Sequence, residues 1–318
     1  MKKNVKKVLA ALLVLVMACG LFTACGGDEE AAYPDGTITL VCNYGAGGGT
    51  DLAARALASE MESILGVPVS VVNKEGGSGT IGITEVANSA ADGYTFGIVT
   101  YAPLVIAPNQ LEVSYTVDDL DYLGTIAQYD YAFCVKADSE INSVADLVEL
   151  SKTQGVSLMA SGFPQPLVAE NLAEITGGDI QNVPVNSSAE VVTGILGGHC
   201  DGGVIVAGDT RAYVESGELK VIATCGAERY EGYPDAPTLI EEGYDIELRS
   251  YMGVGAPKGI DPANFEILKN AFDQAFESET FLTALDNLKT HTYHMSGEEF
   301  YNILAEDEGF WKDYFAAK

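Results

Sequence analysis

Two glycine-rich segments carry the residues whose types and spacing could do chemistry. In the first, the apolar run Ile38–Cys42 leads through four glycines within residues 45–49 into Thr50 and Asp51. Glycine lets the backbone approach a ligand closely, and free N–H groups at the start of a helix attract negative charge. The second segment follows another apolar run and is Gly76-Gly77-Ser78-Gly79-Thr80. Two such turns indicate one shared cleft for a small, anionic ligand.

Two alternatives compete with this interpretation. A plain strand-to-helix connection would need glycine only for its turn. Residues 77–82 also match the G-x-G-x-x-G pattern of dinucleotide-binding proteins, but no acidic residue lies about 20 positions later as a partner for the ribose. The N-terminal export signal also argues against a cytosolic cofactor, so we expect no cofactor.

The N-terminus predicts export and a lipid anchor. Residues 1–7 carry four lysines, and the apolar run over 8–18 is too short for a stable membrane-spanning helix. Small residues before Cys25 resemble the cleavage motif of bacterial lipoproteins, in which the cysteine is lipidated, and Cys19 is the alternative site. We expect a signal peptide over 1–24, a tether over 25–34, and an extracytoplasmic protein held on the outer face of the cell membrane by lipid alone.

The chain is strongly acidic. Removal of residues 1–24 would take four lysines and no acidic residue, leaving 13 Lys and Arg against 46 Asp and Glu. This charge speaks against nucleic acid and anionic lipid surfaces as partners. It does not exclude an anionic ligand, because salt screens exposed charges over ~8 Å. The spacings of Cys42, Cys134, Cys200 and Cys225 fit no zinc pattern, and their disulfide state stays open.

Strand and helix signals alternate along the chain, which predicts two α/β lobes. We expect strands over 95–99, 123–126, 131–135, 156–160, 204–207, 220–224 and 251–256, and helices over 80–91 and 237–243 and from 143, 167 and 189. Three C-terminal helices follow, the last opened by a capping box at Ser296. Thr100 and Tyr101 come directly after a strand, at the edge where open α/β sheets bind ligands.

Short motifs from about residue 33 to the end resemble, in the same order, those of the Bug-type substrate-binding proteins of tripartite tricarboxylate transporters. These motifs lie at 33–35, 47–51, 77–82, 91–95, 196–201 and 237–243. The resemblance implies a periplasmic-binding-protein type II-like fold of two α/β lobes with a ligand cleft between them, lobe 1 being 35–135 plus 250–318 and lobe 2 being 136–249. It implies a monomeric, non-enzymatic receptor that closes on a small carboxylate and delivers it to a membrane permease. A receptor that serves a sensor, or binds a non-carboxylate ligand, is the alternative.

The same resemblance implies ligand contacts from both lobes. The positions carried over are Tyr44, Ala46, Gly47, Gly49, Thr50, Asp51, Ser78, Gly79, Thr80, Thr100 and Tyr101 from lobe 1 and Ser161, Asn186 and Asp209 from lobe 2. Other roles stay open: Thr50 could only cap its helix, Asp51 could pair with Arg55 one turn later, and Asp209 is similarly ambiguous. The chain departs from the family at 163–169, where members often carry a hydroxyl-rich segment, and at Val185, where tyrosine is usual. These departures concern the distal end of the ligand.

Other chemistries find little support. No G-x-S-x-G or H-E-x-x-H motif is present. His291 and His294 could chelate a metal, but they lie between the tail helices, and we expect no metal site. Arg211, Arg229 and Arg249 could reach an anion, although surface salt bridges are the commoner use of arginine. An adhesive lipoprotein would not need two glycine-rich turns.

Overall fold

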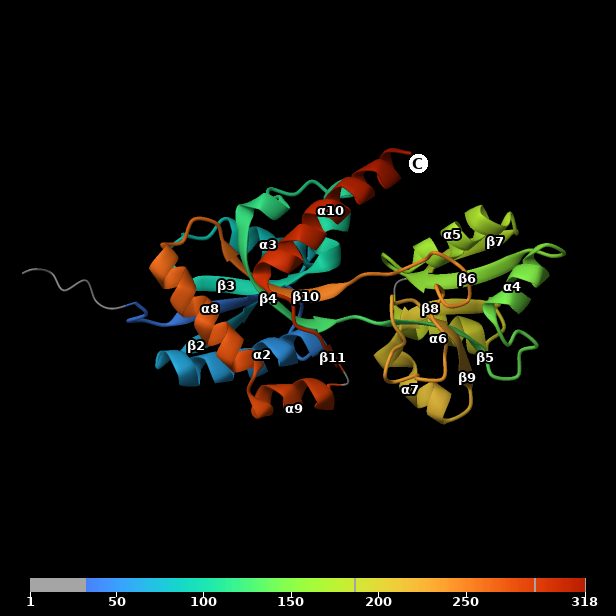
Figure 1. Ribbon diagram of the computed structural model, residues 1–318, viewed down its shortest axis with the longest axis horizontal. Coiled ribbons are helices and arrows are strands. Elements are labelled where there is room, and N and C mark those ends of the chain that lie inside the picture. The colour runs from blue at the N-terminus through green and yellow to red at the C-terminus, as the bar shows by residue number, and fades with distance from the viewer. Residues whose placement is uncertain (1–32, 186, 289, 318) are drawn as a thin grey trace, which may run out of the picture.

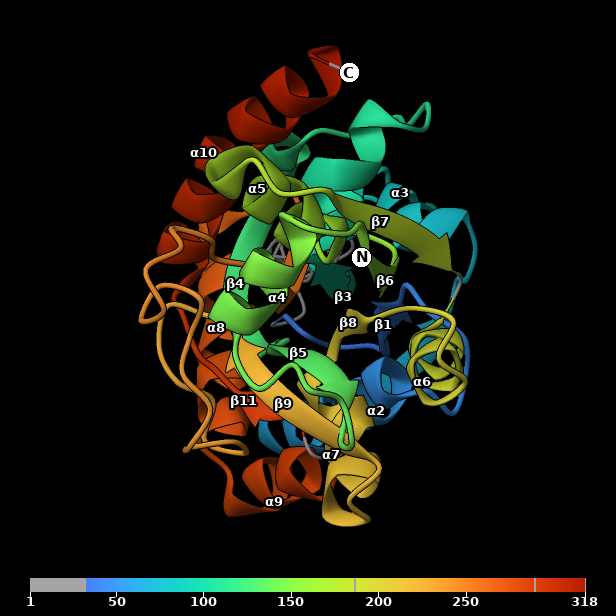
Figure 2. The same ribbon diagram turned by 90° about the vertical axis from the view of Figure 1, so that its right-hand side faces the viewer.

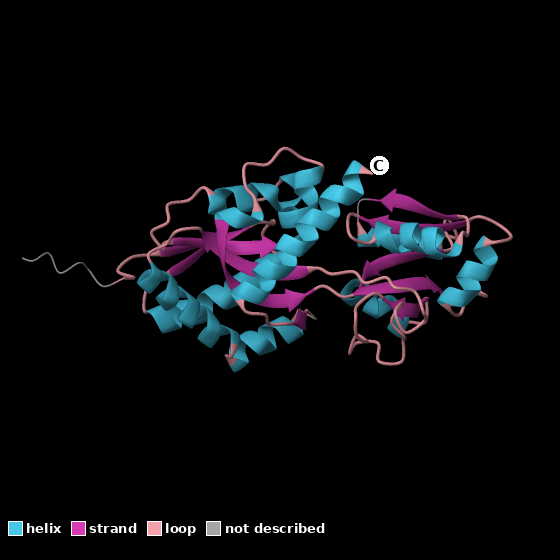
Figure 3. Ribbon diagram, turned by 45° about the horizontal axis from the view of Figure 1, so that its top comes forward, coloured by secondary structure: helices cyan, strands magenta, loops and turns pink. Residues whose placement is uncertain are grey.

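The computed structural model describes residues 33–185, 187–288 and 290–317. The chain forms two lobes, each with its own sheet and helices (Figure 1). Figure 3 shows the strands as two groups, with helices packed around each. The two α/β lobes predicted from the alternation of strands and helices are confirmed.

The first lobe is built on a six-stranded sheet of order β11-β4-β10-β3-β1-β2. Its strands are β1 (Ile38–Cys42), β2 (Val69–Asn73), β3 (Thr95–Thr100), β4 (Leu120–Gln128), β10 (Tyr251–Pro257) and β11 (His291–Thr292). β1 pairs in parallel with both β2 and β3, whereas β10 runs antiparallel to β3 and β4. The carboxyl ends of β1, β2 and β3 therefore lie at one edge, where the loops that follow them meet.

Helices cover both faces of this sheet. They are α2 (Gly49–Leu65), α3 (Thr80–Ala87), α8 (Pro262–Phe276), α9 (Glu279–Asn287) and α10 (Gly297–Ala316), with short helical turns η1 (Gly77–Gly79), η2 (Ala102–Ile106), η3 (Ala107–Asn109) and η4 (Val117–Asp119). Successive residues of β1 point to opposite faces. Leu40 joins the core that includes Leu57 of α2 and Phe272 of α8, and Val41 joins the one that includes Ile83 of α3.

The second lobe has a five-stranded sheet of order β7-β6-β8-β5-β9. Its elements are β5 (Tyr131–Lys136), α4 (Val144–Ser151), β6 (Val156–Ser161), α5 (Pro166–Thr176), β7 (Ile180–Val185), α6 (Ser188–Leu196), β8 (Gly202–Val206), α7 (Ala207–Glu215) and β9 (Leu219–Thr224). β6 pairs in parallel with β7 and β8. The starts of α5, α6 and α7 therefore share one edge, as in the first lobe.

The chain passes between the lobes twice, and the two passages are adjacent. β4 ends at Gln128, and β5 begins in the other sheet after only Tyr129 and Asp130. On the return passage, Ser250 precedes β10 and accepts a hydrogen bond from the Tyr129 N–H at 2.8 Å. Two short, bonded crossings are the geometry of a hinge. Lobe 1 is expected to extend to residue 135. The chain changes sheet before that residue, because β5 already pairs with β8 and β9 of the second sheet.

Helix α10 reaches from the first lobe toward the second. It opens with the predicted capping box, in which Ser296 Oγ accepts from the Glu299 N–H. Its last turns lie beside α5 when the molecule is viewed along its long axis (Figure 2). There the ring of Trp311, which is 2% exposed, meets the ring of Phe163 edge-on at 5.8 Å. The C-terminal helix thus connects the lobes beside the hinge.

Two predicted helices differ in the structure. The helix expected over 80–91 ends at Ala87, because the side chains of Asn88 and Ser89 donate back to carbonyl groups one turn earlier. The prediction of a helix over 237–243 is wrong. Thr238 instead bridges to Thr224 of β9, and the Thr238 N–H donates to Glu241 Oε2 in a closed turn.

The expected signal peptide, Cys19, Cys25 and the tether up to residue 32 lie outside the described residues. Within 33–185, 187–288 and 290–317, no helix combines the length and apolar character needed to cross a bilayer. The four cysteines of this part of the chain, Cys42, Cys134, Cys200 and Cys225, are free thiols.

Candidate functional site

The first glycine-rich segment forms the loop between β1 and α2. Gly47 has φ +84°, a left-handed conformation that glycine adopts without strain. Gly48 is the N-cap of α2 and brings no side chain to cap the helix. Ala46, Gly47 and Gly49 are exposed. Because the first N–H groups of a helix have no partner within it, the start of α2 offers backbone donors to a ligand.

Asp51 organises this loop from inside. Its side chain is 2% exposed, and Oδ2 accepts from the Gly47 N–H at 2.8 Å and from Arg55 Nε at 3.0 Å. Oδ1 accepts from Asn73 Nδ2 at 2.8 Å. Burial acts to raise the pKa of the Asp51 carboxyl, but these hydrogen bonds outweigh it and hold that pKa below its ordinary value. Asp51 therefore fixes the loop with a charge that faces the lobe interior.

The second glycine-rich segment forms a tight turn before α3. Ser78 is exposed with φ +56°, and Gly79 has φ +96°. A Cβ on Gly79 would lie 2.9 Å from Pro103 Cγ and 3.2 Å from Tyr44 Cζ, so the close packing also requires glycine there. Thr80 is buried and donates its hydroxyl to Gly77 O at 2.8 Å. Ser78 and Gly79 therefore bring a second uncapped helix start to the same edge, while Thr80 holds the turn.

The carboxyl end of β3 is followed by one residue that faces the cleft and one that is bonded within the lobe. Thr100 Oγ1 accepts from Asn43 Nδ2 at 3.0 Å and lies 3.3 Å from the Tyr44 hydroxyl. Tyr101 faces the other way: its hydroxyl donates to Asp307 Oδ2 at 2.7 Å and accepts from Trp311 Nε1 at 2.9 Å. The predicted pair is thus divided, with Thr100 at the cleft and the Tyr101 hydroxyl bound to α10.

These loops open onto a cavity of about 300 Å³ between the lobes, which we call the aromatic pocket. It is lined by Tyr44, Thr50, Thr100, Ala102, Pro103, Tyr129, Tyr131, Phe163, Val206 and Ser250. Tyr129 and Tyr131 belong to the crossing between the sheets, and the Tyr129 hydroxyl lies 3.4 Å from Thr50 Oγ1. Burial raises the pKa of Tyr44 and Tyr129, so both hydroxyls are protonated at neutral pH.

The aromatic side chain of Phe163, from the second lobe, closes the aromatic pocket. Ser161 ends β6 and is half-buried, and Phe163 follows it. Besides meeting Trp311, the Phe163 ring lies 5.4 Å from that of Phe315 and 6.3 Å from that of Tyr314, both near the end of α10. Asn186 lies outside the described residues. The ring of Phe163 is therefore held in place at the cleft by the C-terminal helix.

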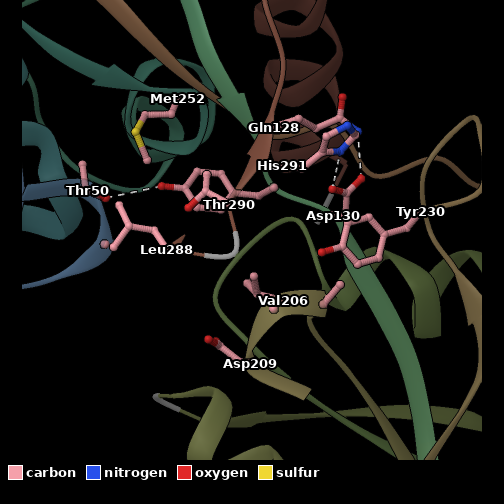
Figure 4. Close-up of a pocket in the computed structure, with 14 residues that line it drawn as sticks. Thr50, Gln128, Asp130, Val206, Asp209, Tyr230, Met252, Leu288, Thr290 and His291 are labelled. Carbon is pink, nitrogen blue, oxygen red and sulfur yellow. Dashed lines mark hydrogen bonds and ion pairs between the residues drawn. The ribbon is translucent and has the colours of Figure 1, made fainter. Parts of the chain in front are cut away.

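A second cavity, the hinge pocket, has a volume of about 400 Å³ and shares Thr50, Tyr129 and Val206 with the first. Its other lining residues are Gly49, Gln128, Asp130, Ala207, Gly208, Asp209, Tyr230, Met252, Leu288, Thr290 and His291. Figure 4 shows Thr50 and Leu288 on one side of this pocket and Val206 and Asp209 on the other. Asp209 is exposed in the first turn of α7.

A hydrogen-bonded His–Asp pair lies at the wall of the hinge pocket. His291 Nδ1 and Asp130 Oδ2 are 2.6 Å apart, and Gln128 Nε2 donates to Asp130 Oδ1 at 3.0 Å (Figure 4). The hydrogen bond with Asp130 raises the pKa of His291. His294 instead lies 3.1 Å from Thr125 O and stacks on Phe276. Among the described residues, no three His, Cys, Asp or Glu side chains gather as a metal site.

The three arginines considered from the sequence have partners of their own. Arg211 pairs with Glu215, Arg229 pairs with Glu241, and Arg249 pairs with Glu247 and lies 3.7 Å from Asp307. Among the described residues, no Lys or Arg lines either pocket. Any anion held at the loops would therefore depend on backbone N–H groups and hydroxyls.

The chain matches a protein family described as "Tripartite tricarboxylate transporter family receptor" (TctC) over residues 53–315. A relative from Cupriavidus necator, "UPF0065 protein in gbd 5'region", is 32% identical, covering 93% of this chain and 92% of the relative. Protein BugT from Bordetella pertussis is 28% identical, covering 88% of each chain. The crystal structure of a TctC solute binding protein from Polaromonas, without ligand, is 28% identical and has a TM-score of 0.81, covering 90% of this chain and 100% of that one.

Proposed function

Because this chain belongs to the TctC family of tripartite tricarboxylate transporter receptors, we propose that it captures a small carboxylate outside the cytoplasm and delivers it to a membrane permease. The observation that carries the proposal is the pair of helix starts, α2 and α3, that meet at one edge of the first sheet with no capping side chain. Orphan N–H groups and the helix dipole at such a point favour a bound anion.

The proposed contacts divide into binding and positioning groups. Backbone N–H groups of Ala46, Gly49, Thr50 and Ser78 bind the carboxylate oxygens. Gly79 shapes the second turn, since its own N–H donates to Gly76 O at 3.0 Å. Contacts on lobe 1 are completed by the hydroxyls of Tyr44, Thr50, Thr100 and Tyr129. Asp51 and Thr80 hold the two loops in shape through the hydrogen bonds they make within lobe 1. Ser161, Asn186 and Asp209 are proposed second-lobe contacts.

Closure follows from the hinge. Rotation about the paired crossings at Tyr129 and Ser250 would bring Val206 toward the loops of lobe 1 and expel water from the cleft. A ligand shifts this equilibrium only as far as it binds the closed form more tightly than the open form. Contacts from both lobes to one molecule supply that difference, and the closed receptor is the form presented to the permease.

Two solved structures of this fold support a carboxylate ligand. MatC from Rhodopseudomonas palustris, 21% identical with a TM-score of 0.70, holds malate. Rpa4515 from the same organism, 24% identical with a TM-score of 0.69, holds adipate. We further propose that Cys25 carries the lipid anchor. A Cys25→Ala variant that remains in the membrane fraction, and is released only by detergent, would contradict lipidation at Cys25. The anchor would then be Cys19 or something other than a lipid.

A thermal-shift screen tests the carboxylate. The purified protein is screened against mono-, di- and tricarboxylates, with sugars and amines for comparison. A ligand at 100 times its dissociation constant adds ~2.7 kcal/mol to the free energy of unfolding, which raises the melting temperature by a few degrees. A saturable shift with a carboxylate supports the proposal. Shifts from sugars or amines alone would overturn it.

One backbone donor offers a matched pair of variants. Gly49 is the first residue of α2, and Gly48 before it has φ −77° and ψ 167°, a conformation suited to the residue before proline. Gly49→Pro therefore removes an N–H group with little strain, because proline is accepted at the first helical position. Loss of a hydrogen bond to a charged group costs about 1.5–3 kcal/mol, so binding should weaken by at least tenfold. Gly49→Ala keeps the N–H and should bind like the original protein.

A further inference from the structure

The walls of the aromatic pocket indicate which carboxylates the cleft accepts. This inference rests on the proposed function and concerns the part of the ligand away from its bound carboxylate. Tyr129, Tyr131, Phe163, Pro103 and Val206 present rings and aliphatic groups, and no charged side chain of the described residues lines the pocket. An apolar wall favours burial of an apolar group and opposes burial of an unpaired charge.

The start of α5 lies beside this wall, and its first turn has no free backbone N–H group. Pro164 and Pro166 have no N–H group. The next two N–H groups are already bonded: that of Leu167 donates to Pro164 O at 3.0 Å and that of Val168 to Gln165 O at 3.2 Å. A second carboxylate reaching this helix start would find no backbone donor in its first turn. In this respect α5 differs from α2, whose first residues Gly49 and Thr50 have no proline and no turn bond of this kind.

The start of α7 opposes a second negative charge in another way. Asp209 is exposed in its first turn and faces the hinge pocket, where Asp130 also lies. The imidazole of His291 is already paired with Asp130 at 2.6 Å. A carboxylate placed beside α7 would meet a like charge at close range.

The size of the pocket sets the scale of the apolar group. An engineered cavity of about 150 Å³ holds benzene, and small-ligand pockets begin near 300 Å³. The aromatic pocket has about 300 Å³, enough for one ring with its carboxylate. The ring of Phe163 is held by Trp311, Tyr314 and Phe315, so it forms a fixed wall against which a flat ligand can pack.

We propose that the ligand is a monocarboxylate with an uncharged, apolar body of about one ring, whose carboxylate binds the loops of lobe 1 and whose body packs against Phe163. Di- and tricarboxylates of similar size are selected against. The body need not be aromatic, because Pro103 and Val206 offer aliphatic contacts.

Calorimetric titration with matched ligands tests this selectivity. Benzoate is compared with terephthalate, and hexanoate with adipate, because each pair differs mainly in a second carboxylate. The expected result is at least tenfold tighter binding of the monocarboxylate in one or both pairs. If the dicarboxylate binds as tightly as the monocarboxylate, or more tightly, in both pairs, the inference is overturned and the carboxylate receptor still stands. Failure of every carboxylate in the wider screen would instead overturn the proposed function and this inference with it.

A pair of phenylalanine variants tests the wall. Phe163→Ala should weaken binding of the preferred monocarboxylate by about tenfold or more, since one lost apolar contact in a pocket is worth ~10–200-fold. Phe310→Ala is the control, because Phe310 lies on α10 with 52% of its surface exposed and does not line the pocket. Unchanged affinity in a folded Phe163→Ala protein would show that Phe163 does not contact the ligand and would overturn this wall. If the variant does not fold, the titrations of the original protein still decide the selectivity.

Discussion

The Thr50 hydroxyl lies 3.4 Å from the Tyr129 hydroxyl, so the first turn of α2 touches the strand crossing that joins the two lobes. Both residues line the aromatic pocket and the hinge pocket, so this contact lies where the two cavities meet. A ligand bound at the start of α2 would therefore be in reach of the hinge itself. We therefore predict that this hydroxyl pair couples binding to lobe closure.

Replacement of Tyr129 by Phe tests this coupling. It removes the hydroxyl and keeps the ring, so ligand affinity should fall by the worth of one hydrogen bond, about 0.5–1.5 kcal/mol. Titration calorimetry with the ligand found by screening measures the change. Tyr94→Phe is the control, because the Tyr94 hydroxyl bonds Asp35 away from the cleft. Equal losses in the two variants would contradict a specific role for Tyr129.

Asp51→Asn should destabilise the first lobe. The substitution weakens the bonds that the buried carboxylate accepts from Arg55, Gly47 and Asn73, and we expect a loss of about 1.5–3 kcal/mol in the free energy of unfolding. Urea unfolding at pH 7 measures this loss. The exposed Asp138, paired with Lys136, is the control, because Asp138→Asn removes only a surface ion pair.

The effect of Asp51→Asn should also depend on pH. Because the folded pKa of Asp51 is below its ordinary value of about 3.9, the carboxylate contributes its full stability above that value. The contribution is lost as pH falls through the lowered pKa. The stability difference between the original protein and Asp51→Asn should therefore be constant from pH 5 to 7 and shrink below pH 4. A difference that grows on acidification would show that Asp51 is not held as a carboxylate.

His291→Gln should show the opposite dependence. The hydrogen bond with Asp130 raises the folded pKa of His291, so the pair stabilises the protein fully below the ordinary pKa of about 6.5. This stability is lost as pH rises through the raised pKa. Melting temperatures from pH 5 to 8 should show His291→Gln furthest below the original protein at the acidic end. Asp130→Asn should give the same trend, since it breaks the same pair, and two different trends would contradict the pairing.

The sequence could predict what depends on neighbouring residues. The run from Ile38 into four glycines is local, and the structure has the expected strand, loop and helix there. The walls of the cleft depend on which strands become neighbours. No local signal marks Tyr129 and Tyr131 as pocket residues. They reach the cleft only because the chain leaves the first sheet after β4 and enters the second. Tyr101 has the right local position, yet its hydroxyl bonds Asp307, 206 residues away.

Two glycines of α10 should respond oppositely to alanine. A Cβ on the buried Gly297 would lie 1.8 Å from the backbone oxygen of Tyr122 in β4, so the helix would have to move off the sheet. We expect Gly297→Ala to lower the free energy of unfolding by about 1–3 kcal/mol or more. At Gly309, in the same helix, a Cβ meets nothing within 4 Å. Gly309→Ala should stabilise the protein by about 0.5–1 kcal/mol, because alanine loses less backbone entropy in a helix.

Urea unfolding of both variants under one condition measures the two effects. The comparison is sharp because the change in sequence is the same and only the surroundings of the new methyl group differ. A neutral Gly297→Ala would mean that α10 does not lie against β4 as described, and destabilisation by Gly309→Ala would mean that the space around Gly309 is not open. Since the last turns of α10 hold Phe163, Gly297→Ala should in addition weaken ligand binding, whereas Gly309→Ala should leave the affinity unchanged.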